Sequence, residues 1–157
     1  MFQFLVNKKT ATMMIIAVFL IVVDRLFKVL ALNVFNSQPI EIFNGFKLGF
    51  AINKNVAFSL PAYGVILNLV IIVLIIALVW QFLKLLKIKQ TVQASLIFMV
   101  ILGAVSNLLD RFLYGGVIDY FDVERFTIFN IADAMITIGI IVFVRISLKQ
   151  YVQNHSA

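Results

Sequence analysis

Four long runs of apolar residues dominate the pattern of hydrophobic and polar positions along this chain. They extend over residues 12–32, 63–83, 92–113 and 131–148, with most polar and charged residues between them. Each run has about the length of a transmembrane helix, which needs roughly 20 mostly apolar residues. The pattern predicts an all-α membrane protein with four transmembrane helices, in a single domain over residues 1–157.

The segment between the first two runs has a different period. In FKLGFAIN, residues 46–53, every second position is apolar, which is typical of a strand. PIEIF precedes this stretch, and the turn-forming pair Asn44-Gly45 separates the two. We therefore expect a small extracytoplasmic β-sheet between spans one and two, lying like a cradle on the membrane surface.

Composition supports an integral membrane protein. The chain is 63% hydrophobic and 13% charged, with a mean hydropathy of +1.08, outside the usual balance of a soluble domain. The first run meets Asp24 and Arg25 rather than a small-residue cleavage site, so we do not expect a cleavable signal peptide.

Basic residues indicate the orientation, because Lys and Arg near span ends favour the cytoplasmic side. The ends that would face the cytoplasm carry Lys8, Lys9, Lys84, Lys87, Lys89, Arg145 and Lys149. Both termini should then be cytoplasmic, with residues 33–62 and 114–130 on the outer side. The net charge of +6 is a topology signal, and no basic stripe interleaved with aromatics predicts nucleic-acid binding.

Residue types that are missing narrow the possible chemistry. The chain has no cysteine, and its single histidine, His155, lies in a polar tail. A thiol nucleophile, a thiolate metal site and a Ser-His-Asp arrangement are therefore excluded. Catalysis would have to use carboxylates, lysine, hydroxyls or backbone groups, and we expect no metal and no organic cofactor.

Acidic residues gather at the predicted outer ends of the spans. They are Asp24, Asp110, Asp119, Asp122 and Asp133. Asp24 can pair with Lys28 one helical turn later. Asp110 and Arg111, beside Asn107, suggest a local cluster of ion pairs and hydrogen bonds.

Asp133 allows two interpretations. It can complete a capping box with Asn130 at the start of the fourth helix. Alternatively, it can form a catalytic pair with Asp119 of GGVIDYF, if the loop between the last two spans folds back. Two close carboxylates resist simultaneous ionisation, so one can hold a proton while the other activates water.

Five motifs in order make the chain resemble the bacterial lipoprotein signal peptidases, also called signal peptidase II, which are aspartic proteases of the inner membrane. They are DRLFK, NKNVAFS, GAVSNLLDR, GGVIDYFD and FNIADA, and the match runs from Asp24 to Gly139. Two positions depart from the family pattern, because Asn55 and Ser106 replace glycines. A turn at Asn55 can survive, since Asn tolerates positive φ, and Ser106 is small enough for tight helix packing.

The resemblance implies roles for specific residues. Asp119 and Asp133 would be the catalytic pair. Residues that would shape or contact the substrate site are Asn53, Gly103, Asn107, Arg111, Val117, Asn130 and Ala132, and those that would support it are Asp24, Lys28 and Asp110.

The resemblance also implies the substrate and the location. The substrate would be a diacylglyceryl-prolipoprotein, cleaved just before the lipidated Cys of its lipobox. The enzyme would be a multi-pass protein of the bacterial inner membrane, with its active site near the outer face and in contact with lipid. Cyclic peptides of the globomycin type would be inhibitors.

Two other functions compete with this one. A Ser/Lys membrane protease could use Ser106 or Ser59 as nucleophile and Lys28 as base. A small proton-linked carrier or an assembly subunit could use its intramembrane acids for conduction or packing. The carrier is disfavoured because the acids gather at the outer ends, whereas a proton path should continue across the bilayer.

Overall fold

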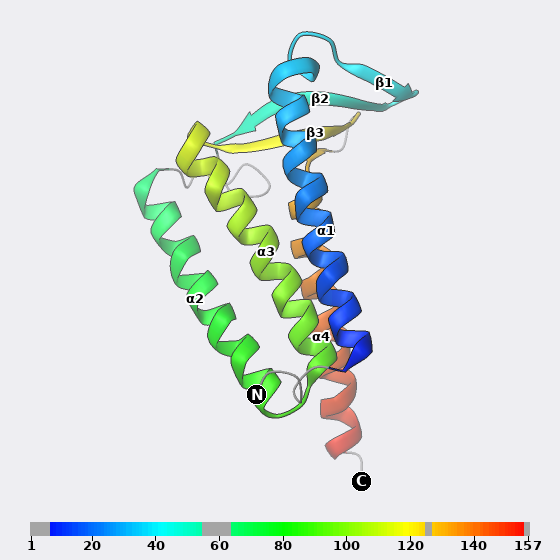
Figure 1. Cartoon of the computed structure of the whole chain (residues 1–157), viewed down its shortest axis with the longest axis vertical. Coiled ribbons are helices and arrows are strands. Elements are labelled where there is room, and N and C mark those ends of the chain that lie inside the picture. The colour runs from blue at the N-terminus through cyan, green and yellow to red at the C-terminus, as the bar shows by residue number, and fades with distance from the viewer. Residues whose placement is uncertain (1–6, 55–63, 125–126, 156–157) are drawn as a thin grey trace.

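A computed structural model describes residues 7–54, 64–124 and 127–155. Asn55 and Ser59 lie outside the described residues. The helices are α1 (Lys8–Leu30), which continues into the π-helix η2 (Ala31–Phe35), α2 (Val65–Lys87), α3 (Thr91–Tyr114) and α4 (Ile131–His155). Figure 1 shows these helices running along the long axis of the molecule.

Among the described residues, three helices are long and apolar enough to cross a membrane, namely α2, α3 and α4. They overlap the second, third and fourth predicted runs, but α2 ends at Lys87 and α4 at His155, beyond the predicted ends at Leu83 and Leu148. Helix α1 covers most of the first run, but it carries Asp24, Arg25 and Lys28 in its last two turns. That α1 forms a fourth span stays a prediction.

The predicted β-hairpin is confirmed. Strands β1 (Ile40–Phe43) and β2 (Phe46–Asn53) pair antiparallel on either side of Asn44 and Gly45. Gly45 has a φ of +86°, which a residue without Cβ adopts at little cost. The turn and the alternating strand therefore lie where the local sequence indicates.

The loop expected between the last two spans is replaced by two further strands. These are β3 (Val117–Val123) and β4 (Thr127–Phe129), which extend the sheet in the order β1-β2-β3-β4, all antiparallel. The first four residues of β3 are all buried. A strand covered on both faces lacks the alternation by which strands are usually found, so no period in the sequence indicates β3.

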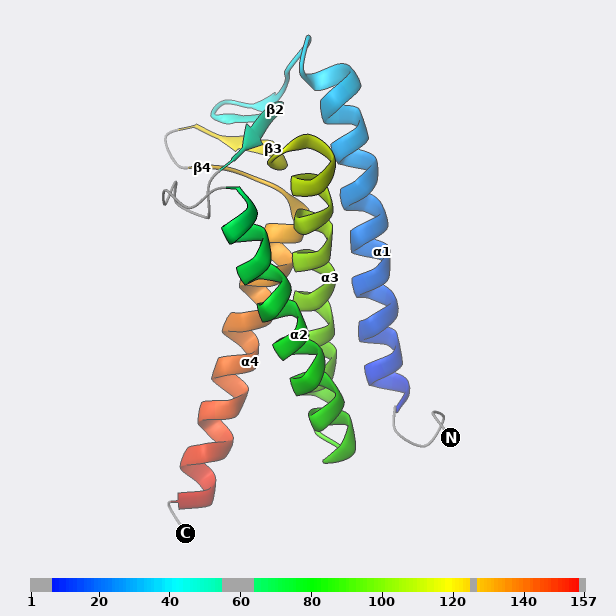
Figure 2. The ribbon, with the colours of Figure 1, turned by 90° about the vertical axis from the view of Figure 1, so that its left-hand side faces the viewer.

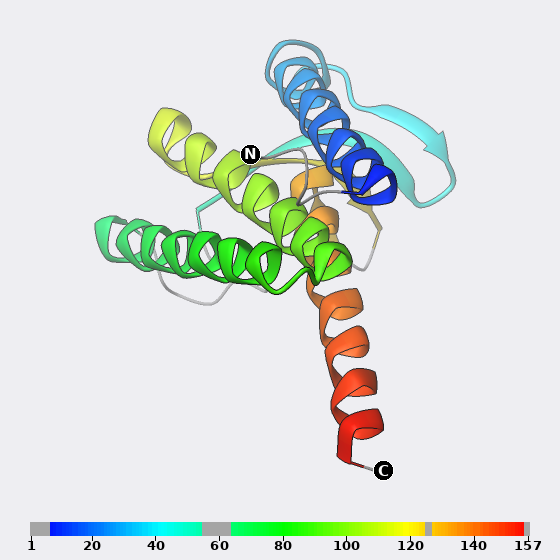
Figure 3. The same ribbon diagram turned by 60° about the horizontal axis from the view of Figure 1, so that its bottom comes forward.

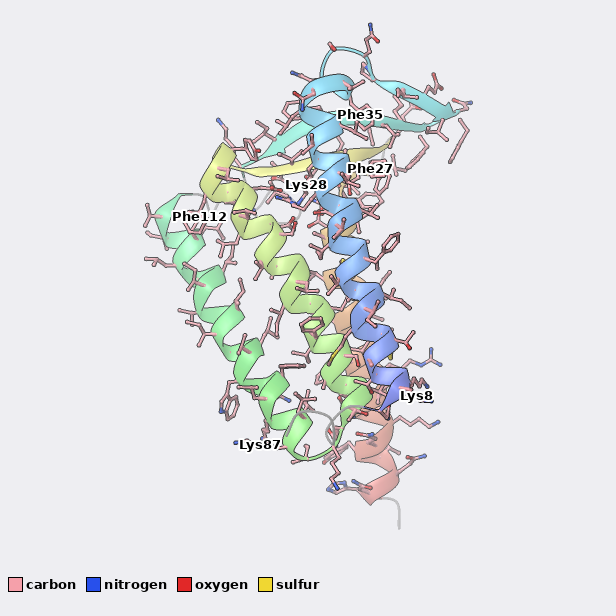
Figure 4. All side chains as sticks on the ribbon, viewed as in Figure 1. Lys8, Phe27, Lys28, Phe35, Lys87 and Phe112 are labelled. Carbon is pink, nitrogen blue, oxygen red and sulfur yellow. The ribbon has the colours of Figure 1, made fainter. Side chains whose placement is uncertain are left out.

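The sheet lies at one end of the helices (Figures 1 and 2). The α2–α3 link and the last turn of α4 lie at the opposite end, where Lys87 marks the end of α2 (Figure 4). The sheet and the aspartates therefore lie at one end, and most of the lysines, among them Lys8 and Lys87, lie at the other, which is the distribution on which the predicted orientation depends. A small core joins the sheet to η2 through Ala31, Phe35, Ile118 and Tyr120.

Helix α3 packs against α1, α2 and α4, and it lies between α1 and α2 when the lower end is brought forward (Figure 3). Its contact with α4 is very close, because a Cβ added at Gly103 would lie 2.7 Å from the carbonyl oxygen of Ala132. A Cβ at Gly139 would lie 2.6 Å from Val100. Helix α3 thus fixes the first turn of α4 beneath the sheet.

Candidate active site

Asp119 and Asp133 come together where β3 lies over the start of α4. Asp119 is buried within β3, at 2% exposure, and Asp133 lies in the first turn of α4. Their carboxylates interact electrostatically, as the predicted pair requires. Between the two acids the chain contributes strand β4, which pairs antiparallel with β3, and then Asn130.

Asn130 connects the two aspartates. Its Nδ2 donates to Oδ1 of Asp119 at 2.6 Å, and its Oδ1 accepts the backbone N–H of Asp133 at 2.8 Å. Its own backbone N–H reaches Oδ2 of Asp133 at 3.4 Å. The predicted capping pair is therefore confirmed, and the same side chain contacts the other acid. Asp133 can therefore take part in the cap of α4 and lie beside Asp119 at the same time.

Two further asparagines hold the carboxylates from neighbouring elements. Asn53, the last residue of β2, donates from Nδ2 to Oδ2 of Asp119 at 3.3 Å. Asn107 of α3 donates from Nδ2 to Oδ1 of Asp133 at 2.7 Å. Amide donors from β2 and α3, together with Asn130, thus fix the orientation of both acids.

The environment of Asp119 favours its neutral form. Burial, followed by the nearby negative charge of Asp133, raises the pKa of Asp119 from 3.8 to about 7. The hydrogen bonds from Asn130 and Asn53 and the positive charge of Lys28 oppose the shift without cancelling it. At neutral pH Asp119 can therefore hold a proton beside a second carboxyl group, as acid–base chemistry requires.

A buried cluster of charges lies behind the pair. Lys28 is 3.0 Å from Asp24, which confirms the predicted pairing one turn apart, and 2.7 Å from Asp110. Arg25 reaches Asp110 at 2.7 Å. The buried charges of Asp24, Asp110 and Lys28 are therefore balanced by the partly exposed guanidinium of Arg25. In Figure 4, Lys28 lies just below the strands of the sheet, level with the upper part of α3.

The predicted cluster at the end of α3 has partners that the sequence did not indicate. Asp110 was expected to pair locally beside Arg111, but its bases come from α1 and it also accepts the backbone N–H of Ile118 at 3.3 Å. Lys28 extends the cluster to the active site, because it donates to Oδ1 of Asn107 at 3.1 Å. One lysine thus connects α1 with the amide that holds Asp133.

Asp24 gathers hydrogen bonds from three other elements. It accepts the hydroxyl of Tyr120 at 3.0 Å, the hydroxyl of Ser106 at 2.7 Å and the backbone N–H of Ala132 at 3.2 Å. Sequence reasoning missed Tyr120 entirely. The only available signal was its position directly after Asp119.

The other predicted site residues surround the pair. Arg111 interacts electrostatically with Asp119 and Asp133, and its Nη1 donates to the carbonyl of Lys54 at 3.4 Å. Val117 pairs with Asn53 across the β2–β3 ladder. Asp122, further along β3, pairs in register with Lys47 and Ile128 and is only half-buried.

The hydrogen bonds and the burial of Ser106 disfavour a Ser/Lys protease that uses Ser106 as nucleophile. The Ser106 hydroxyl donates to Asp24 and is 4% exposed, so a substrate carbonyl has little access to it. Lys28 makes ion pairs with two carboxylates and donates to Ser106 and Asn107, which makes it a donor rather than a general base.

The family model and the similar proteins indicate the same family. Residues 16–149 match the family described as signal peptidase (SPase) II. A lipoprotein signal peptidase of Thermodesulfovibrio yellowstonii is 31% identical, with 86% of this chain and 94% of the relative covered. One from Staphylococcus aureus strain JH9 is 31% identical, with 88% of each covered.

Local similarity is higher to a lipoprotein signal peptidase of Campylobacter jejuni subsp. doylei, at 44% identity, but this alignment covers 59% of the chain and 62% of that protein. Among solved structures, a bacterial membrane enzyme determined by the in meso method at 2.3 Å resolution is 28% identical with a TM-score of 0.75, and 92% of each chain is covered. A second such enzyme, at 1.9 Å resolution, has a TM-score of 0.71 and 26% identity, with 88% of this chain and 92% of that chain covered.

Proposed function

The chain belongs to the signal peptidase II family, and we propose that it removes signal peptides from diacylglyceryl-modified prolipoproteins as an aspartic endopeptidase. The bond that it cleaves lies just before the lipidated Cys of the lipobox. The observation that carries the proposal is the pairing of buried Asp119 with partly buried Asp133, each held by asparagine amides and bridged by Asn130.

The proposed reaction is hydrolysis by general acid–base catalysis. Asp133 takes a proton from a water molecule, whose oxygen attacks the scissile carbonyl carbon, while Asp119 donates its proton to the carbonyl oxygen. In the second step the C–N bond breaks, the proton on Asp133 passes to the leaving nitrogen, and Asp119 recovers a proton from the hydroxyl. Asp119 is assigned the acid role because its pKa, raised to about 7, leaves a substantial fraction of this carboxyl group protonated at neutral pH.

The surrounding residues have proposed roles in binding. Arg111, which interacts with both acids, can donate to a substrate carbonyl beside the scissile bond. Asn53 and Val117 line the adjacent end of the sheet, so β2 and β3 can cover the bound peptide and exclude competing water. Gly103 allows α3 to approach Ala132 closely beside Asp133, because a Cβ at this position would lie 2.7 Å from the Ala132 carbonyl oxygen.

The position of the pair suits a substrate that is anchored in lipid. The acids lie at the sheet end of three helices that are able to cross a membrane. We infer that this end lies at the outer face of the inner membrane, because most of the lysines, including Lys8, Lys84 and Lys87, lie at the opposite end. A signal helix and two acyl chains could then remain in the bilayer while water enters from outside.

A mass-resolved cleavage assay with purified protein tests the proposal. The substrates are a diacylglyceryl-prolipoprotein and the same protein without its lipid, and the enzymes are wild type and Asp119→Asn. We expect cleavage before the Cys of the lipidated substrate alone, with no product from the variant. If folded wild-type protein leaves the lipidated substrate intact, the proposed function is wrong.

A further inference from the structure

Tyr120 is a buried phenol between the two halves of the candidate site. It follows Asp119 in β3, and because neighbouring strand residues point to opposite faces, its ring faces away from the carboxylate. The ring is 0% exposed. Its hydroxyl donates to Oδ1 of Asp24 at 3.0 Å and accepts the backbone N–H of Ile131 at 3.1 Å.

The N–H of Ile131 belongs to the first turn of α4, where backbone donors have no acceptor within the helix. The N–H of the next residue, Ala132, goes to the same Oδ1 of Asp24 at 3.2 Å. Tyr120 and Asp24 therefore satisfy two consecutive donors at the start of the helix that carries Asp133. Burial raises the pKa of Tyr120, so its hydroxyl remains a neutral donor and acceptor.

We propose that Tyr120 is a positioning residue for the peptidase reaction, whose hydroxyl holds the first turn of α4 against β3 and so sets the separation of Asp119 and Asp133. The proposal rests on the proposed function for its effect on turnover. The structural part of the proposal is that Tyr120 sets the separation of the two carboxylates, and this part can be tested without measuring turnover.

Packing allows the hydroxyl to be removed on its own. The Tyr120 ring stacks on Phe27 with a centroid separation of 5.3 Å and meets the edge of Phe121 at 4.8 Å. Phe at this position would keep both contacts. Tyr120→Phe would leave the N–H of Ile131 without its acceptor and Asp24 with one donor fewer, which frees the first turn of α4 to shift.

Such a shift should alter the titration of Asp119. The charged groups that act on Asp119 are Asp133 from α4, Lys28 from α1 and Arg111 from α3. If α4 moves away, the repulsion from Asp133 weakens and Asp119 should lose its proton at lower pH. We expect the midpoint to fall by about half a pH unit or more, with kcat about 10-fold lower and KM unchanged, because misplaced catalytic groups reduce the rate.

Ser106→Ala is the matched control. Ser106 also donates a buried hydrogen bond to Asp24, at 2.7 Å, and its other side-chain bond is from Lys28, on the same helix as Asp24. Both variants therefore remove one hydroxyl from Asp24, but only Tyr120→Phe removes a bond to the backbone of α4. The shift of the Asp119 midpoint should be clearly smaller in Ser106→Ala.

The experiment follows the carboxyl carbons of ¹³C-labelled aspartate by NMR in detergent, with the Asp119 signal assigned by its loss in Asp119→Asn. An unchanged midpoint in Tyr120→Phe, or an equal shift in both variants, would overturn the proposal. Hydrogen exchange of the Ile131 amide in wild type is a second test that needs no variant. Slow exchange is expected. Exchange as fast as in an exposed turn would contradict the hydrogen bond from Ile131 to the Tyr120 hydroxyl. If wild type cleaves no lipidated prolipoprotein, the proposed function fails, while both measurements still decide the role of Tyr120.

Discussion

The side-chain amide of Asn130 donates a 2.6 Å hydrogen bond to the carboxylate of Asp119. The oxygen of the same amide caps the helix at the N–H of Asp133. One fully buried side chain thus sets the start of α4 and the orientation of the acid in β3. The residue that caps the helix also holds the first acid of the proposed catalytic pair.

Asn130→Asp should therefore reduce cleavage strongly. The new carboxylate has the same shape, but it cannot donate to Asp119 and it places a third acid beside the pair. We expect kcat/KM to fall roughly 100-fold or more, measured by the mass-resolved assay. The control is Asn33→Asp, where an exposed amide donates to the carbonyl of Val29 at 2.7 Å. Activity within a few-fold of wild type in Asn130→Asp would show that the bridge is dispensable.

Asp119→Asn and Asp133→Asn should each abolish cleavage while the protein stays folded and inserted in the membrane. Each change removes a proton donor or acceptor from the proposed chemistry, and we expect a loss of about 1,000-fold or more. Asp122→Asn is the control, because Asp122 lies on the same strand and pairs in register with Lys47. Near-normal turnover in either of the first two variants would remove that acid from the mechanism.

Activity should depend on pH through Asp119. Its pKa is raised to about 7, chiefly by burial, so the protonated acid is present below this pH and is lost above it. In the proposed mechanism kcat should fall as the pH rises through about 7. A pH–rate profile on lipidated substrate, at constant detergent and ionic strength, measures this limb. A rate that stays level up to pH 9 would exclude Asp119 as the proton donor.

The free energy of unfolding should also depend on pH through Asp119. The folded pKa of Asp119 lies above its ordinary value of 3.8, so between about pH 4 and pH 7 the native state binds the extra proton. The free energy of unfolding therefore falls as pH rises across this window, by up to about 4 kcal/mol. Asp119→Asn lacks this loss. Thermal unfolding measures this effect as the Tm of Asp119→Asn minus the Tm of wild type. This difference should be larger at pH 8 than at pH 4.5. The same Tm difference at both pH values would contradict the raised pKa of Asp119.

Gly103→Ala should disturb the site through the backbone. The new Cβ would lie 2.7 Å from the carbonyl oxygen of Ala132, so the first turn of α4 must move. We expect a destabilisation of about 1–3 kcal/mol and reduced cleavage. Gly49→Ala is the matched control, because a Cβ added there would have no atom within 4 Å and the φ of Gly49 is not positive. Equal Tm values for the two variants would show that α3 and α4 separate easily.

Some of this arrangement follows from residues that are close in sequence. The pairing of Asp24 with Lys28 and the capping of α4 by Asn130 depend on spacings of four and three residues, which a helix converts directly into contacts. The hairpin around Asn44-Gly45 follows equally from its turn and its alternation. The resemblance of five motifs to the family extended this local information to the proposed catalytic pair.

Other parts of the arrangement depend on tertiary packing. Strand β3 has no polar face to give it a period, and the bonds from Tyr120 to Asp24 and from Arg25 to Asp110 join residues 96 and 85 positions apart. No spacing encodes such pairs, because they exist only once β3 and α3 pack on α1. The amino-acid sequence alone indicates a membrane protein with a hairpin and a likeness to one peptidase family. Packing determines which buried donors hold the two acids, since a buried polar group must take its partner from whichever element the fold brings beside it.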